Sequence, residues 1–167
     1  STDVKFRGEA PGGDKSCTFA MVGHNDVLRL FESAIDAMSH ATFTKLLGKD
    51  WTADHRLSVN GSGNYESIKR YLANHTEIKS LWFCYDSDQA GQDGAEASSV
   101  RLFRDFPDRE LSVMFCSPVK NKDWNEALQL FRVVESHGVA VREFLAPTEF
   151  RSILPPDCDE NEFDFEP

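Results

Sequence analysis

Short apolar runs alternate with longer amphipathic stretches along most of the chain. The runs are rich in β-branched and aromatic residues, which is typical of buried strands. They predict strands over Cys17–Val22, Val27–Phe31, Arg56–Asn60, Ser80–Tyr85 and Leu111–Cys116, with a weaker strand or extended arm over Gly138–Phe144. The amphipathic stretches repeat apolar residues at helical spacing. They predict helices over Ala34–Leu47, Tyr65–Asn74, Gly91–Phe106 and Trp124–Glu135, and a short helix over Pro147–Leu154.

Strands and helices follow one another repeatedly, which predicts an α/β fold with a mostly parallel central sheet and helices on both faces. The length of 167 residues suits one domain. We expect a polar lead over residues 1–16, the α/β domain over 17–154 and an acidic, disordered tail over 155–167. We expect the first long helix to stop at Gly48. Its predicted buried face consists of Ile35, Met38, Phe43, Leu46 and Leu47.

The most distinctive segment is Leu81–Gly94, where an apolar run ends abruptly in Asp86 and Asp88. Alternate residues of a strand point the same way, so both carboxylates are expected at one spot beyond the strand end. In open α/β sheets this edge is where ligands bind. Adjacent like charges need a cation or a shared proton, and hard oxygen ligands suit Mg²⁺ or Mn²⁺. Taken alone, the two aspartates suit turn or helix-cap residues as well as they suit metal ligands.

A second acidic cluster follows the strand Val27–Phe31. Glu32 stands at the strand end, Ser33 is a suitable N-cap for the next helix, and Asp36 lies one turn further on the same face. Joined with Asp86 and Asp88, Glu32 favours a metal site. Asp36 has three interpretations: it contacts the metal, it complements the positive end of the helix dipole, or it pairs with a neighbouring basic side chain.

Further residues have both structural and functional interpretations. Gly91 allows a tight passage from strand to helix close to a ligand. In the segment Lys122–Asn125, Asp123 suits a helix cap and Trp124 a packing residue. Alternatively, Lys122 contacts a phosphate and Asp123 supplies another acid. The glycine-rich segment Asn60–Asn64 follows a strand, so its backbone amides suit a phosphate group. Because it lacks the Gly-Lys-Ser/Thr of a P-loop, a plain connection is the favoured interpretation.

The three segments Phe31–Ser39, Asp86–Gly91 and Lys122–Asn125, in this order, resemble the Toprim family. The resemblance covers about Phe19–Leu130 and is greatest to Toprim-like domains of bacterial plasmid and conjugative-element proteins. Ser33 stands where primases more often have glycine, so the similarity to primases themselves is looser. The family also includes topoisomerases, OLD-family nucleases and recombination mediators.

The resemblance implies a Toprim-like, Rossmann-like fold and phosphoryl or nucleotidyl transfer on nucleic acid. It implies that Glu32 is a general acid/base or metal ligand and that Asp86 and Asp88 are ligands of Mg²⁺ or Mn²⁺. Primase-like synthesis and nuclease-like cleavage both fit, within a protein of mobile-element DNA replication or mobilisation. The alternative is a non-catalytic module that binds nucleic acid or protein. Topoisomerase activity is not expected, because the tyrosines fall in predicted strands and helices as packing residues; they are Tyr65, Tyr71 and Tyr85.

The net charge of −10 argues against strong binding of DNA or RNA by this domain alone. Residues 155–167 hold six acids and no base, so the rest of the chain carries −4. We interpret this tail as a solvated end; alternatively it mimics nucleic acid or docks on a basic partner through Phe163 and Phe165. Tight binding is expected to come from other domains of a longer parent protein.

Cysteines and histidines are scattered, without Cys-x-x-Cys or a histidine pair at helical spacing, so no zinc site is expected. The cysteines are Cys17, Cys84, Cys116 and Cys158. They are expected to be reduced thiols in a cytoplasmic protein. No apolar run has membrane-spanning length, and no signal peptide is recognised, so no membrane partner is expected.

Overall fold

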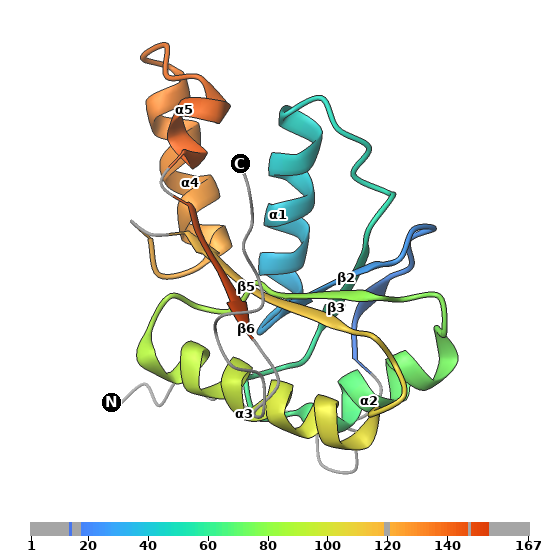
Figure 1. The fold of residues 1–167 in the computed structure, drawn as a ribbon. Coiled ribbons are helices and arrows are strands. Elements are labelled where there is room, and N and C mark those ends of the chain that lie inside the picture. Colours follow the sequence, from blue (N-terminus) through green and yellow to red (C-terminus); the bar gives the residue numbers. More distant parts are fainter. Residues whose placement is uncertain (1–13, 15–17, 119–120, 147, 154–167) are drawn as a thin grey trace, which may run out of the picture.

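The computed structural model describes residues 14, 18–118, 121–146 and 148–153 and forms one six-stranded sheet (Figure 1). The strand order is β1-β3-β2-β4-β5-β6. The four inner strands are mutually parallel and the two edge strands are antiparallel to their neighbours. The strands are β1 (Ala20–Met21), β2 (Val27–Phe31), β3 (His55–Ser58), β4 (Ser80–Phe83), β5 (Ser112–Pro118) and β6 (Thr148–Ile153). This arrangement confirms the predicted α/β fold with a mostly parallel sheet.

Helices cover both faces of the sheet (Figure 1). One face carries α1 (Ala34–Leu46), α4 (Trp124–Glu135) and α5 (Val141–Leu145), and the other carries α2 (Tyr65–Asn74) and α3 (Gln89–Asp105). Alternate residues of each strand enter opposite cores, as a pleated backbone requires. In β4, Leu81 and Phe83 pack toward α2 and α3, whereas Trp82 packs toward α1 and α4.

The predicted buried face of α1 is wrong in part. Ile35 and Met38 are 55% and 46% exposed. The predicted Phe43 is buried, but small and polar side chains form the rest of the buried face; they are Asp36, Ala37, Ser39 and Ala41. Small residues let the helix approach its neighbours closely, a requirement that a search for large apolar residues overlooks. The predicted stop is confirmed, because Gly48 adopts φ +71° directly after the helix.

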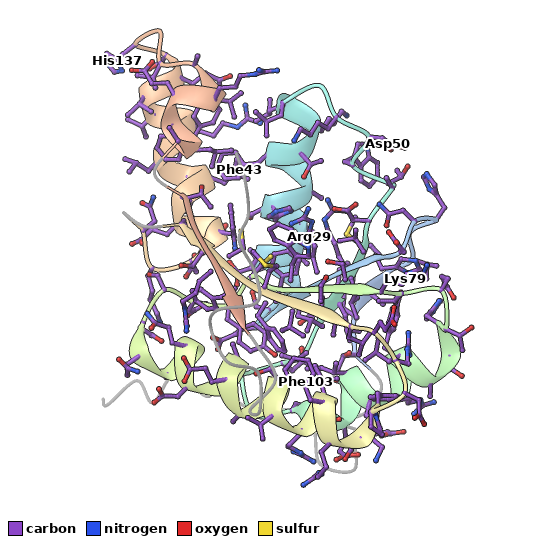
Figure 2. All side chains as sticks on the ribbon, viewed as in Figure 1. Arg29, Phe43, Asp50, Lys79, Phe103 and His137 are labelled. Atoms are coloured by element: carbon purple, nitrogen blue, oxygen red, sulfur yellow. The ribbon has the colours of Figure 1, made fainter. Side chains whose placement is uncertain are left out.

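The predicted weak strand over Gly138–Phe144 is also wrong, because this segment contains α5. Gly138 adopts φ +86° and its N–H donates to the carbonyl of Glu135, which ends α4. The chain then turns, and Val141 and Phe144, at helical spacing, pack against the buried cluster between α1, α4 and the sheet. Figure 2 shows Phe43 of α1 directed toward this region, and its ring lies 6.1 Å from that of Phe144.

The short helix predicted over Pro147–Leu154 is wrong as well. The backbone over Thr148–Ile153 forms β6, which pairs antiparallel with β5 along its whole length. This pairing satisfies the backbone hydrogen bonds that the edge of β5 would otherwise leave open, so a non-local partner outweighs the local helical tendency.

The predicted lead and tail lie almost wholly outside the described residues, so the domain boundaries remain predictions. Cys17 and Cys158 lie there too, whereas Cys84 and Cys116 are buried free thiols. Within the described part of the chain, no helix combines the length and apolar character needed to cross a bilayer.

Candidate metal centre at the carboxyl edge of the sheet

Two neighbouring parallel strands bring Glu32 and Asp86 together. β2 and β4 pair in a register that aligns Leu30 with Phe83, so both strands finish at the same edge of the sheet. Glu32 directly follows β2, and its Oε1 accepts a hydrogen bond from the backbone N–H of Asp86 at 3.3 Å. The early glutamate and the later aspartate therefore share one site, although 54 positions separate them in the sequence.

Asp88 is the N-cap of α3. Its Oδ1 accepts a hydrogen bond from the N–H of Gly91 at 3.0 Å, and its side chain remains 46% exposed. The capping role that the sequence left open is thus realised for one carboxylate oxygen. The second oxygen, Oδ2, faces the ammonium group of Lys122.

Lys122 lies between the two aspartates. Its Nζ is 3.4 Å from Oδ2 of Asp86 and 3.9 Å from Oδ2 of Asp88. The loop that carries Lys122 is held in place by Ser87, whose N–H donates to the carbonyl of Lys122 at 2.8 Å. The lysine side chain itself is 59% exposed, so it can leave the aspartates without disturbing packed structure.

Gly91 is required for space at this site. A Cβ atom on it would lie 2.2 Å from the carbonyl oxygen of Asp86 and 3.1 Å from Oε1 of Glu32. The close passage from strand to helix that the sequence predicts is therefore confirmed. Glycine is needed here because there is no space for a Cβ beside Asp86 and Glu32. Its backbone conformation does not require glycine, since Gly91 is not among the residues with positive φ.

Asp36 and Asp123 have clear structural roles. The buried carboxylate of Asp36 accepts hydrogen bonds from the hydroxyl of Ser33 and from the N–H of Asn125, the latter at 3.0 Å. It thereby joins the first turn of α1 to that of α4. Asp123 caps α4 by accepting from the N–H of Glu126 at 2.7 Å, and Trp124 is buried beside it. The predicted capping and packing roles in this loop are confirmed.

The electrostatics of the acidic group call for a cation. Burial, and then the charge of Asp86, raise the pKa of Glu32. Burial also raises the pKa of Asp86, although Lys122 opposes this shift. The same aspartates raise the pKa of Lys122, with Asp86 the main cause. Partly desolvated carboxylates that already attract an ammonium ion form a suitable environment for Mg²⁺ or Mn²⁺, which prefer oxygen ligands.

The acids do not gather as tightly as a closed metal cage would. Among the described residues, His55, His75 and Glu77 are the group whose potential ligand atoms all lie within 4.8 Å of one another. A metal at the acidic group would replace the ammonium of Lys122 and draw the carboxylates inward. This histidine group could not be predicted from the sequence, because His55 and His75 are far apart in the chain and meet only after β3 and α2 pack together.

A sequence model of the family described as Toprim-like matches residues 29–128 of the chain. The matched range begins in β2 and ends within α4, so it includes all the candidate site residues named from the sequence. No curated protein matches the chain.

We expect Glu32→Gln to stabilise the metal-free protein at pH 7. Because folding raises the pKa of Glu32, the ionised carboxylate lowers the free energy of unfolding. This loss of stability is absent below the ordinary pKa of glutamate and complete above the raised pKa. Solvent screens this partly exposed acid, so the gain in free energy of unfolding should not exceed about 1 kcal/mol. Denaturant unfolding at pH 7 and at about pH 3 measures it, and the gain should vanish at the lower pH. Glu66→Gln, at an exposed ion pair with Arg101, is the control and should give no gain. Lower stability of Glu32→Gln at pH 7 would contradict this account.

We expect Gly91→Ala to destabilise the protein. In an ordinary helix the same substitution increases stability by about 0.5–1 kcal/mol. The added Cβ must displace the backbone of Asp86, which should cost about 1–3 kcal/mol. Thermal or denaturant unfolding measures the change. Gly63→Ala is the control, because a Cβ there meets nothing within 4 Å and should be neutral. Equal stability of the two variants would show that the site tolerates a side chain at position 91.

Proposed function

The chain belongs to the Toprim-like family, whose domains bind divalent metals and act on nucleic acids, and on this premise we propose that it is a Mg²⁺-dependent phosphoryl- or nucleotidyl-transfer domain. The observation that carries the proposal is the meeting of Glu32 with Asp86, beside Asp88, at the carboxyl edge of the sheet. We propose that it acts in a mobile-element replication or mobilisation protein, in primase-like synthesis or nuclease-like cleavage.

In this proposal Glu32, Asp86 and Asp88 hold the ion, which can be Mg²⁺ or Mn²⁺. When bound, the ion would neutralise and orient the phosphodiester. The raised pKa of Glu32 brings its carboxyl group closer to the range in which it can accept and return a proton. Asp36 and Asp123 support the site by fixing the first turns of α1 and α4.

Lys122 is assigned a phosphate-binding role. Its long, exposed side chain partly neutralises Asp86 and Asp88 until a divalent cation takes that place. The released ammonium group then lies at the rim of the site, where it can contact a phosphate oxygen of DNA or RNA. The net charge of −10 means that the domain alone binds such a substrate weakly, and other domains of a longer protein supply the affinity.

A non-catalytic module that binds nucleic acid or protein is the second candidate. It is favoured by the same lysine, because an ammonium that stays between the aspartates leaves no need for a metal. The role of Asp88 as a helix cap also suits this alternative.

Metal titration separates the two candidates. We expect Mg²⁺ or Mn²⁺ to raise the melting temperature of the full chain, because a ligand at 100 times its Kd adds about 2.7 kcal/mol to folding stability. The double variant Asp86→Asn/Asp88→Asn should lose this effect. Asp93→Asn is the matched control, since Asp93 accepts from Gln89 on the exposed side of α3 and should leave the effect intact. An unchanged melting curve of the wild type would favour the non-catalytic module. Assays of primer synthesis and strand cleavage by a longer parent protein, with Glu32→Gln as the inactive control, then identify the reaction.

Removing the competing ammonium should strengthen metal binding. We expect Lys122→Met to lower the Kd for Mg²⁺ by about tenfold, which corresponds to roughly 1.4 kcal/mol of relieved competition. The same variant should weaken binding of a nucleic-acid substrate. Calorimetric titration measures both, and Lys79→Met, at the opposite edge of the sheet, is the control. Unchanged Mg²⁺ affinity in Lys122→Met would exclude competition between lysine and metal.

A further inference from the structure

A second group of potential metal ligands lies at the opposite edge of the sheet. His55 opens β3, His75 directly follows α2, and Glu77 stands in the loop that leads into β4. Lys79, labelled in Figure 2, marks the start of β4 on this amino edge. The acidic group of Glu32, Asp86 and Asp88 lies past the carboxyl ends of the parallel strands, so the two groups are separate.

The three side chains converge on a small volume. Oε1 of Glu77 lies 2.9 Å from Nδ1 of His75 and 3.8 Å from Nε2 of His55. One potential ligand atom from each residue lies within 4.8 Å of the others. A tetrahedral zinc ion with bonds of about 2.0–2.2 Å needs ligand atoms roughly 3.5 Å apart. Small side-chain rotations would therefore complete the geometry.

His55 is the most informative member because one of its nitrogens is buried and none of the described residues forms a hydrogen bond with it. The residue is 1% exposed, and its Nδ1 is hydrogen-bonded to the hydroxyl of Tyr71 at 2.9 Å. Within the part of the chain that the structure describes, its Nε2 has no hydrogen-bond partner, and it lies 3.8 Å from Oε1 of Glu77. A buried polar atom left in this state is costly, and coordination to a metal would remove that cost. When Nδ1 donates to Tyr71, the lone pair of Nε2 is available for a metal.

The loop that carries the other two ligands is held by Arg109. Its guanidinium group donates to the carbonyls of Leu72, His75 and Ile78, at 3.0, 3.2 and 2.6 Å respectively. The rings of Tyr71 and His75 also stack, with centroids 4.3 Å apart. The positions of His75 and Glu77 relative to His55 are therefore fixed by the fold before any ion binds.

We propose that His55, His75 and Glu77 bind Zn²⁺ or a similar late first-row divalent ion, with water in the fourth position. Two imidazoles and one carboxylate suit zinc, cobalt or nickel and not magnesium. The ion would link the start of β3 to the end of α2 and to the loop before β4. It would stabilise the amino edge of the sheet independently of the proposed phosphoryl-transfer chemistry.

The test uses the full chain carrying Asp86→Asn/Asp88→Asn, so that zinc cannot bind at the acidic group. After treatment with a chelator, calorimetry with Zn²⁺ should detect one ion per chain, and added Co²⁺ should give the visible absorption of a low-symmetry nitrogen and oxygen site. In this background, His75→Ala and Glu77→Gln should each weaken zinc binding by more than tenfold. Tyr71→Phe, which removes only the supporting hydroxyl, should weaken it by about tenfold.

The matched control is His137→Ala, because the side chain of His137 is exposed on the far side of the molecule and its described hydrogen bonds are to the neighbouring Ser136 and Val133. It should bind zinc as tightly as its parent. His75 and Glu77 are partly exposed, and circular dichroism of their variants verifies that the fold is intact. Zinc affinity that is equal with and without His75, or the absence of zinc binding in the parent, would overturn the proposal and leave an ordinary histidine–glutamate pair.

Discussion

The parallel pairing of β2 with β4 is the constraint on which the candidate site depends. Its register makes both strands finish together, which brings Glu32 next to the backbone of Asp86. The next hydrogen bond past this register, from the N–H of Cys84 to the carbonyl of Leu30, continues the pairing to the edge of the site. A shift of this register would turn the residues of β4 to the wrong faces and separate the two acids.

The charges of Asp86 and Asp88 are partly offset by an exposed group and not by a buried one. Lys122 is the cation nearest to Asp86 and Asp88 in the described structure, and it reaches them along an exposed side chain. A buried arginine in the same place would be costly to displace, because its removal would leave uncompensated charges away from solvent. An exposed lysine gives each acid a modest stabilisation that a divalent ion can exceed. The acidic group therefore keeps its fold without metal and retains the capacity to bind one.

Local sequence patterns predicted some elements well. β2, α2 and α4 begin and end where the apolar patterns predict, because each has a strong pattern and a clear boundary such as Asp123. The meeting of Glu32 with the segment after β4 was predictable from the rule that parallel strands finish at one edge. The close approach at Gly91 was predictable on other grounds, from the tight passage between strand and helix.

Other features depend on partners far away in the sequence. β6 forms because β5 offers an open edge, which no local pattern reports. The buried face of α1 follows from close packing of small residues such as Ala37 and Ala41. The contact of Lys122 with the aspartates, and the meeting of His55 with His75, require the packed tertiary structure. Because the Lys122 loop follows a strand, the sequence indicates its place beside the acids, but spacing along the chain carries no signal for the histidine pair.

The hydrogen bond from Asn125 to Asp36 has a consequence for the order in which the protein assembles. It joins residues 89 positions apart, and the carboxylate of Asp36 is buried in the finished structure. During biosynthesis α1 emerges long before α4, so this carboxylate must stay hydrated until Asn125 has left the ribosome. We therefore expect this face of the sheet to close late, when the long-range packing of α4 onto α1 supplies the partner of Asp36.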